Sequence, residues 1–387
     1  MDNETKKELI DLTQKLIQFP TENPPGKEKP CIEFIEKWFK KRDMDPTVLN
    51  KPHENRPQLT VTIGQGSPNL ILNGHIDVVP AGPHSEWKHP PFKGKIENGK
   101  IYGRGTCDMK ANVALAMVLA NDLKHIIEDG KLDGSLTVQI AIGEETGEPG
   151  TKKLLEIDDG GDFGVVLEPT SMKTATAEKG LAWYEIVLEG KSSHASRPNE
   201  GENPIMNSRI LLKKLEEHNE ELKKRKHELV GKPHLTVTRF EAGTKENVIP
   251  DRAKLTIDRR FLPSENIGEI DDEIENILKD LNEAHGLKTS WKRTKTYEPA
   301  ETQNDNRLVK TFRKNSKQLA GVSSEPCGTE FSSDFRNFVN DVKIPAITWG
   351  PHDPDQAHTI DENVRIDEIK KGWKVLKKSV LDLLSEG

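Results

Sequence analysis

Three short apolar runs in this chain each end in side chains of the types that bind metals or move protons. The runs and the residues that follow them are 70–72 with His75 and Asp77, 136–142 with Glu144 and Glu145, and 164–167 with Glu168. Runs of this length predict buried strands, and α/β sheets carry their chemistry at the carboxyl ends of such strands. The recurrence therefore predicts an α/β sheet with a polar site along one edge.

Length and charge narrow the class of protein. At 387 residues the chain predicts two or three domains, and its net charge of −7 argues against a nucleic-acid-binding surface. No apolar run approaches the roughly 18 residues of a membrane span, and the N-terminal MDNETKKELIDL lacks the form of a signal peptide. The three cysteines stand far apart, which excludes a disulfide framework and a thiolate zinc site. We therefore expect a cytoplasmic, soluble protein with no nucleic-acid or membrane partner.

The segment from 181 to 293 has a different pattern from the rest of the chain. Its predicted elements are strands at 181–189, 235–240, 253–261 and 287–292 and helices at 203–228 and 267–284. The order β-α-β-β-α-β is the ferredoxin-like split motif, and it interrupts a chain that otherwise alternates strand and helix. We therefore predict an inserted domain over 180–293 and a discontinuous catalytic domain formed by 1–179 and 294–387.

Five side chains suit a metal site that contains no thiolate: His75, Asp108, Glu145, Glu168 and His358. Two imidazoles and three carboxylates are a suitable ligand set for two Zn²⁺ or similar ions, with one carboxylate bridging them. Of two adjacent carboxylates such as Glu144 and Glu145, one can bind metal while the other stays free as a base. Taken alone, Asp108 also suits the N-cap of the helix that follows it, and the Glu pair suits an acidic surface loop.

Seven motifs, in chain order, resemble a known family. They are GHIDVVP (74–80), GRGTCDMK (103–110), EETGEPGT (144–151), LEPT (167–170), GKSSHASRPNEGENPI (190–205), NVIPD (247–251) and AHTIDE (357–362). Together they resemble the dinuclear-zinc amidohydrolase and exopeptidase family, which includes acetylornithine deacetylase, succinyl-diaminopimelate desuccinylase, aminoacylase and the glutamate carboxypeptidases. The resemblance covers nearly the whole chain. It implies a three-layer α/β zinc-hydrolase domain with an inserted ferredoxin-like α+β domain that acts as a lid and in dimerisation.

The resemblance assigns a metal-binding role to each matching position. His75 would bind one ion and His358 the other, with Asp108 bridging both. Glu145 and Glu168 would each complete the ligands of one ion. The resemblance thus implies the same five ligands that the residue types suggest.

The resemblance also implies catalytic side chains that bind no metal. Glu144 would be the general base, and Asp77 would orient the His75 ring. His194, in the inserted domain, would donate to the oxyanion of the tetrahedral intermediate. In the family this histidine often comes from the other subunit, so the resemblance implies a homodimer formed through the inserted domain.

Substrate recognition is implied at three further positions. Asn247 and Arg260 match residues that hold the substrate's carboxylate, which suits the planar fork of arginine. Arg336 belongs to a late loop, 328–336, that shapes the acyl pocket in relatives and that matches their pattern only loosely. A second departure is Ala111-Asn112, where relatives have glycine after the DMK sequence. It removes no ligand.

We therefore expect a metal-dependent hydrolase of N-acyl amino acids, similar to acetylornithine deacetylase and succinyl-diaminopimelate desuccinylase, with two Zn²⁺, Co²⁺ or Mn²⁺ ions. A metallo-carboxypeptidase or a di- or tripeptidase of the same family is the alternative. A binding protein without activity would need no general base, so Glu144 argues against it. A nicotinamide dehydrogenase would need the full GxGxxG fingerprint, which the GRG segment lacks.

Overall fold

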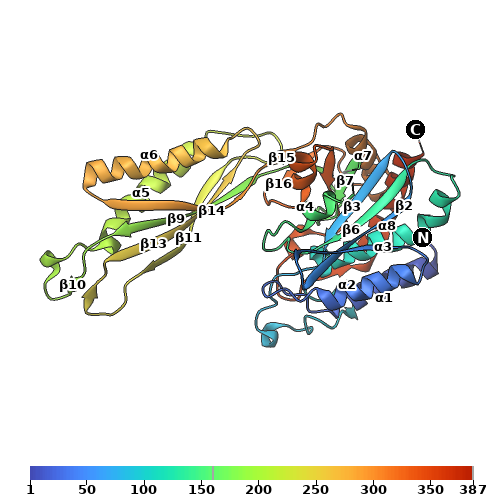
Figure 1. The fold of residues 1–387 in the computed structure, drawn as a ribbon, viewed down its shortest axis with the longest axis horizontal. Helices are drawn as coiled ribbons and strands as arrows, with labels where there is room; N and C mark the ends of the chain where they lie inside the picture. The colour runs from blue at the N-terminus through green and yellow to red at the C-terminus, as the bar shows by residue number, and fades with distance from the viewer. Residues whose placement is uncertain (159–160, 386–387) are drawn as a thin grey trace. The chain divides into compact units, whose positions relative to one another are not determined.

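The computed structural model describes residues 1–158 and 161–385. The chain forms two compact units, and each has an apolar core of its own (Figure 1). Unit 1 consists of Met1–Thr176, Thr302–Cys327 and Ser333–Gly387, and unit 2 consists of Ala177–Glu301 and Gly328–Ser332. Unit 2 is therefore an insertion in the chain of unit 1. Three borders between the units fall within or next to short strands, which are β8 (Ala175–Glu178), β15 (Ala300–Glu301) and β16 (Cys327–Thr329).

Unit 1 is built on a mixed sheet whose centre is parallel. Counted from the β1 edge, its first six strands are β1 (Thr47–His53), β2 (Arg56–Gly64), β6 (Ser135–Ala141), β3 (Asn69–His75), β7 (Phe163–Val166) and β17 (Ala346–Thr348). β3 runs parallel to both β6 and β7, whereas β1 and β2 form an antiparallel edge. Parallel neighbours end at the same edge of a sheet, so the residues that follow β3, β6 and β7 gather there.

Helices cover both faces of this sheet. They are α1 (Asn3–Ile17), α2 (Lys29–Lys40), α3 (Ala111–Glu128), α4 (Gly150–Leu155), α7 (Arg307–Ala320) and α8 (Ile366–Leu384). Because side chains alternate along a strand, Leu136, Val138 and Ile140 of β6 enter the apolar core against α3. Gln139 points to the opposite face, where α4 packs, and donates to Asp158 at 2.7 Å. The predicted α/β class is confirmed.

A small antiparallel sheet joins two distant parts of unit 1. Its order is β18 (Asn363–Arg365), β5 (Lys100–Tyr102) and β4 (Lys95–Glu97). Val364 of β18 pairs with Ile101 of β5. The segment after β5 carries Asp108, and the segment before β18 carries His358. This sheet therefore anchors both segments next to each other.

Unit 2 has the predicted β-α-β-β-α-β order. Its elements are β9 (Gly180–Glu189), α5 (Pro204–Leu222), β11 (His234–Ala242), β13 (Arg252–Phe261), α6 (Ile267–His285) and β14 (Lys288–Tyr297). The sheet order is β11-β13-β9-β14, with every neighbour antiparallel. Tyr184, Ile186 and Leu188 of β9 lie in a core that includes Leu211 of α5 and Ile274 of α6, so both helices cover one face.

The helix predicted at 203–228 is shorter in the structure. α5 ends at Leu222, and Lys223 is its C-cap. The residues that follow are a basic run with no apolar side chain to continue the buried stripe. Arg225 pairs instead with Glu265 and Glu273, at 2.6 and 2.5 Å. Tertiary ion pairing therefore replaces the last turns that the charge-rich sequence suggested.

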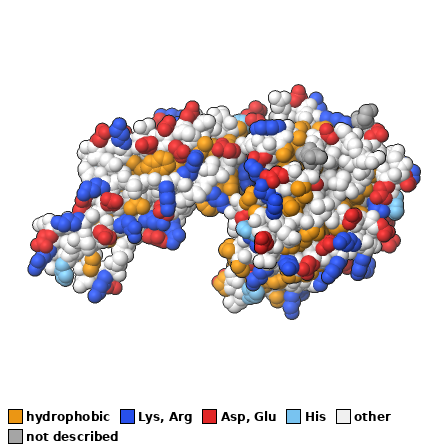
Figure 2. Space-filling view, in the orientation of Figure 1, with side chains coloured by type: hydrophobic (Ala, Val, Ile, Leu, Met, Phe, Trp, Pro, Cys, Tyr) orange, Lys and Arg blue, Asp and Glu red, His pale blue; other side chains and the backbone are white. Residues whose placement is uncertain are grey.

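Surface charge of both signs is scattered over the visible face of each unit (Figure 2). This mixed distribution agrees with the small negative net charge of the chain. Among the described residues, none of the helices combines the length and the apolar character that crossing a bilayer requires.

Candidate metal centre and catalytic site

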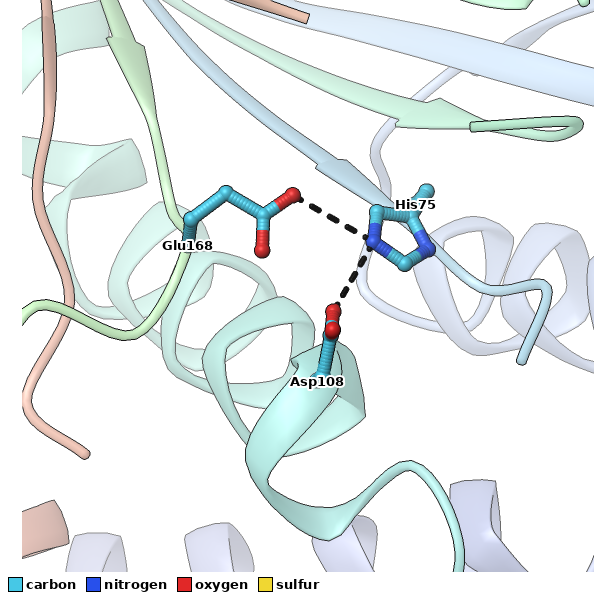
Figure 3. Close-up of side chains that lie close together, drawn as sticks. All are labelled: His75, Asp108 and Glu168. Atoms are coloured by element: carbon cyan, nitrogen blue, oxygen red, sulfur yellow. Dashed lines mark hydrogen bonds and ion pairs between the residues drawn. The ribbon is translucent and has the colours of Figure 1, made fainter. Parts of the chain in front are cut away.

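A first group of ligand-type side chains, which we call the strand-end group, consists of His75, Asp108 and Glu168 (Figure 3). The Nε2 atom of His75 lies 3.1 Å from Oδ1 of Asp108 and 3.4 Å from Oε1 of Glu168. His75 is the last residue of β3, and Glu168 follows the end of β7. The parallel sheet therefore brings these two side chains together, and Asp108 reaches them from the turn before α3.

The hydrogen bonds of the His75 ring define which nitrogen faces the carboxylates. Nδ1 lies 2.9 Å from the backbone carbonyl oxygen of Asp77, which can only accept, so Nδ1 carries a proton. In the neutral ring, Nε2 then directs its lone pair at Asp108 and Glu168, which are also acceptors. A divalent cation, or a second proton on the ring, is needed to balance these converging acceptors. The donor set therefore fits a divalent metal ion.

A second group, which we call the loop group, consists of Asp108, Glu145 and His358. The Nε2 atom of His358 lies 3.1 Å from Oδ2 of Asp108 and 3.2 Å from Oε2 of Glu145. Asp108 thus offers Oδ1 to the strand-end group and Oδ2 to the loop group. A carboxylate shared in this way is suited to bridge two metal ions.

The pKa values of these side chains reflect the close approach of the carboxylates. Hydrogen bonds to Asp108 and Glu145 raise the pKa of His358 to about 11. Burial raises the pKa of Glu168 to about 7, and the charge of Asp108 adds to this effect. Burial opposes the charged form of His75, but Asp108 and Glu168 outweigh it and raise its pKa well above the usual value. Without a bound cation, protons on the two imidazoles therefore balance the carboxylates.

The carboxylate of Asp77 holds the loop that follows β6. Its donors are the backbone N–H groups of Gly143, Glu144 and Glu145, at 2.8, 3.3 and 3.2 Å, and the side-chain amide of Asn23, at 3.1 Å. Oδ1 of Asp77 lies 3.6 Å from Nδ1 of His75, so it is the Asp77 carbonyl that hydrogen-bonds to the ring. The sequence suggested that the Asp77 side chain orients His75. In the structure the Asp77 carbonyl accepts from the His75 ring, and the Asp77 carboxylate lies within ion-pair distance of the same ring nitrogen. That carboxylate also holds the backbone of Glu144 and Glu145.

Glu144 lies beside both groups and belongs to neither. Burial raises the pKa of its carboxyl well above the usual value; the His75 ring opposes this shift, and the charges of Glu168 and Asp334 add to it. Within the described part of the chain, no hydrogen bond reaches the Glu144 carboxylate. Divalent cations bound nearby would favour its ionised form. The side chain is therefore available to accept a proton.

Three of the predicted residues lie in unit 2, at two ends of its sheet. β10 (Ser193–His194) pairs with β12 (Val248–Ile249), and Ala195 donates to the carbonyl of Asn247 at 3.0 Å. His194 and Asn247 are therefore neighbours, beyond the end of β9. Arg260 pairs with Leu181, near the start of β9. The length of β9 separates the two sites by roughly 25 Å at 3.4 Å per strand residue, so one chain does not bring Arg260 to His194.

The hydrogen bonds of these side chains limit what they can do. His194 Nδ1 accepts from the backbone N–H of Ser196 at 3.2 Å, so the neutral ring carries its proton on Nε2 and can donate from there. Arg260 contacts Asp258 through Nε and NH2, at 2.8 and 3.1 Å. Arg336, in unit 1, donates to the carbonyl of Ser333.

Sequence reasoning missed three residues near the predicted ligands. Asn112 is fully buried and donates from Nδ2 to the carbonyl of Leu167 at 2.6 Å, directly before Glu168. Arg104 and Glu362 form a buried ion pair with 2.6 Å between NH1 and Oε2. Their positions were the available signal in the sequence. Arg104 and Glu362 lie within the GRGTCDMK and AHTIDE motifs, and Asn112 stands two residues after the first motif ends.

Comparison with known proteins identifies the family. The model described as "Peptidase family M20/M25/M40" matches residues 71–382. The chain belongs to this family. The family and the fold class that the sequence motifs implied are thus confirmed, and the chain is a hydrolytic enzyme.

Individual relatives carry both deacylase and peptidase names. The probable succinyl-diaminopimelate desuccinylase of Staphylococcus aureus (strain N315) is 29% identical over 416 residues, which cover 99% of each chain. The M20 family metallo-carboxypeptidase Sso-CP2 from Sulfolobus solfataricus has a TM-score of 0.79 at 20% identity, with 99% of each chain covered. Aminopeptidase PepT from Bacillus cereus ATCC 10987 has a TM-score of 0.78 at 18% identity, with 98% of each chain covered. At these identities the two structural neighbours establish the fold alone. Metal-dependent amide hydrolysis is the reaction class that the family and its relatives support.

Proposed function

We propose that this chain hydrolyses the amide bond of a small N-acyl amino acid, as acetylornithine deacetylase and succinyl-diaminopimelate desuccinylase do. The observation that carries the proposal is the sharing of Asp108 between two converging ligand groups, with Glu144 beside both and bound to neither. That arrangement supplies two cation sites and a separate base. A short peptide with a free carboxylate is the alternative substrate of the same reaction class.

The strand-end group and the loop group would each hold one divalent ion. Imidazole and carboxylate ligands without thiolate suit Zn²⁺, and they also accept Co²⁺ and Mn²⁺. When bound, such ions polarise a substrate carbonyl and make a water molecule more acidic. The protein contributes the spacing of the ligands and the placement of the base.

Glu144 would carry the proton through the reaction. It takes a proton from the water that attacks the amide carbon, and it gives this proton to the nitrogen as the carbon–nitrogen bond breaks. The products are a carboxylic acid and a free amine. The Asp77 carboxylate supports this role because it accepts the N–H groups of Gly143 and Glu144 and so fixes the backbone of the base.

Side chains of unit 2, together with Arg336 of unit 1, would recognise the substrate and its oxyanion. Arg260 would bind the substrate's free carboxylate, with Asn247 and Arg336 as further contacts, and His194 would donate from Nε2 to the oxyanion. Arg260 lies at one end of β9, and His194 and Asn247 lie at the other. One substrate that contacts all three would therefore take Arg260 from one subunit and His194 with Asn247 from the other. This supports a homodimer formed through unit 2. We also expect the enzyme to act in the cytoplasm.

The role of Glu144 is tested by Glu144→Ala in metal-loaded protein. Turnover should fall by about 10²–10⁴-fold, the usual contribution of a general base, while metal content stays that of the unaltered chain. Glu156→Gln, at an exposed carboxylate paired with Lys153, is the control and should keep full turnover. Full activity in Glu144→Ala at normal metal content would exclude this carboxylate as the base.

The subunit that supplies His194 is tested by mixing two inactive variants, Glu144→Ala and His194→Ala. If His194 acts across the dimer, each mixed dimer has one site with both residues intact, and random mixing restores about a quarter of full activity. If His194 acts within its own chain, no mixed dimer has an intact site and activity stays absent.

The substrate class is tested with the metal-loaded enzyme on acetylornithine, succinyl-diaminopimelate, simple N-acetyl amino acids and dipeptides. Hydrolysis confined to the dipeptides would contradict the deacylase assignment.

A further inference from the structure

Arg104 and Glu362 form a buried ion pair next to the metal ligands, and none of the roles above uses it. The two side chains are 4% and 0% exposed, with 2.6 Å between NH1 of Arg104 and Oε2 of Glu362. Removing two charges from water is costly, so a buried pair of this kind is weak evidence for stability by itself. What the pair touches on either side is therefore more informative than the pair alone.

Glu362 holds the backbone of the shared ligand. Its Oε1 atom accepts the N–H group of Cys107 at 2.7 Å and the N–H group of Asp108 at 3.2 Å. Oε2 is the atom that faces Arg104. One carboxylate therefore connects the turn that carries Asp108 to the guanidinium.

Arg104 holds the backbone of the other loop-group segment. NH1 donates to the carbonyl of Thr359 at 3.2 Å, and NH2 donates to the carbonyl of His358 at 3.3 Å. His358 itself has a φ of +63°, a left-handed conformation that a residue with a side chain rarely adopts. Its side chain is 50% exposed, so packing around the ring does little to place it. The backbone contacts from Arg104 therefore matter for where the imidazole points.

We propose that Arg104 and Glu362 are positioning residues that set the spacing between Asp108 and His358 and so determine how tightly the loop group binds its metal ion. This inference rests on the proposed function, because it requires that the loop group binds metal. The strand-end group depends less on the pair. His75 ends a strand that is hydrogen-bonded to β6 and β7, and its ring is fixed by the Asp77 carbonyl.

The first test is Arg104→Lys. Lysine keeps a positive charge opposite Glu362, but it has no planar fork with which to reach Glu362 and two carbonyl groups at once. Stepwise titration with Zn²⁺ by calorimetry should show two ions on the unaltered chain. In the variant, one ion should bind about 10–100-fold more weakly, the usual effect of losing a contact that orients a ligand, and the other should bind normally. With Co²⁺, the visible absorption of the ion in the loop group should change, while that of the ion in the strand-end group stays the same.

The matched control is Arg259→Lys in unit 2. Arg259 and Glu265 also form a buried ion pair, with side chains 0% and 8% exposed and 2.6 Å between them, and Glu265 also accepts a backbone N–H, from Leu262 at 2.8 Å. This pair touches no metal ligand. Both ions should therefore bind Arg259→Lys with unaltered affinity. Equal weakening in the two variants would mean that any lost buried pair loosens the protein, and it would overturn the inference.

A double variant separates positioning from stability. In Arg104→Met with Glu362→Met both charges leave together, so no unpaired charge remains buried and the fold is expected to persist. The positioning contacts to the backbone of Asp108 and His358 are nevertheless gone. The loop-group ion should therefore still bind more weakly to the double variant than to the unaltered chain. Normal binding of both ions by the double variant, or by Arg104→Lys, would overturn the inference. Failure of the unaltered chain to bind any divalent ion would instead overturn the proposed function, and this inference with it.

Discussion

The strand-end group and the loop group share Asp108 but are held by different kinds of structure. In the strand-end group, His75 is the last residue of a central parallel strand, and its side chain is 1% exposed. In the loop group, His358 lies outside any helix or strand, in a left-handed conformation, and its ring is half exposed. The first predicted ligand is placed by the sheet and the second by contacts between distant loops. A ligand at a strand end thus needs little beyond local sequence, whereas a loop ligand needs a tertiary scaffold.

The largest effect is expected where the two groups meet, at Asp108. Asp108→Ala removes one ligand atom from each group, so metal content should fall for both ions. Turnover should fall about a thousandfold or more, since carbonyl polarisation by metal ions is worth several kcal/mol. Metal analysis and kcat on the same preparation measure both. Asp122→Ala, at a partly buried carboxylate that pairs with Lys377 and with no predicted ligand, is the control. Retention of both ions in Asp108→Ala would show that the residue is not shared.

A comparison of His75→Ala with His358→Ala separates the two groups. Each variant should lose one ion and keep the other, and activity should fall about a hundredfold or more in both. The metal-free His75 variant should also be less stable, because its buried ring balances the charges of Asp108 and Glu168. The half-exposed His358 should matter less for stability. Metal stoichiometry and urea unfolding measure the two quantities, and equal destabilisation by both substitutions would contradict the difference between the groups.

A smaller effect, confined to the loop group, is expected from Asp77→Asn. The amide keeps one acceptor oxygen but cannot accept all the N–H groups that the Asp77 carboxylate now holds. The loop with Glu144 and Glu145 should loosen, which weakens the loop-group ion and turnover by about 10–100-fold. His75 keeps its carbonyl contact, so the strand-end ion should be retained. If the strand-end ion were lost first, the Asp77 side chain would act mainly on His75, as the sequence suggested.

The mildest test is the pH dependence of metal-free stability. Burial raises the pKa of Glu168 to about 7 in the folded chain, against an ordinary value of 4.5. Its contribution to the stability of the metal-free protein is therefore fully present below pH 4.5 and is lost as the pH rises to 7. His358 has a pKa of about 11 against 6.5, so its contribution is present below pH 6.5 and is lost as the pH rises toward 11. Glu168 and His358 thus both make the metal-free protein less stable as the pH rises. The urea midpoint of the metal-free protein should therefore fall between about pH 5 and about pH 9.

Added Zn²⁺ should reverse this pH trend. Metal binding requires ionised carboxylates and unprotonated ring nitrogens, so its stabilisation increases as the pH rises. The metal-loaded protein should therefore lose less stability than the metal-free protein over the same range, or gain some. Parallel curves with and without Zn²⁺ would mean that the protons on these residues are not exchanged for metal.

Local sequence determined the sheet and the positions of the predicted ligands that follow its strands. Leu70–Leu72 and Leu136–Ile142 predict strands because short apolar runs must be buried on both faces, and His75 and Glu145 then fall at strand ends whatever the rest of the chain does. The ferredoxin-like order of unit 2 could be read for the same reason, from periodicity within each element. The family motifs predicted the five ligand positions and Glu144 as a set. The end of α5 at Leu222 escaped prediction because it depends on ion pairs from Arg225 to distant residues.

Only the tertiary structure decided how those residues meet. Glu145 and His358 are 213 positions apart, and no local pattern specifies that they share Asp108, because the contact depends on how two loops pack. The same is true of Arg104 and Glu362, which pair with each other across 258 positions and whose other partners are main-chain groups that any sequence offers. Asp77 shows most simply what local sequence leaves open. Strand alternation predicts that it lies beside His75, but not that its carboxylate also accepts the backbone N–H groups of the Glu144 loop. Residue periodicity encodes elements, whereas hydrogen bonds across long sequence separations form only once those elements have packed.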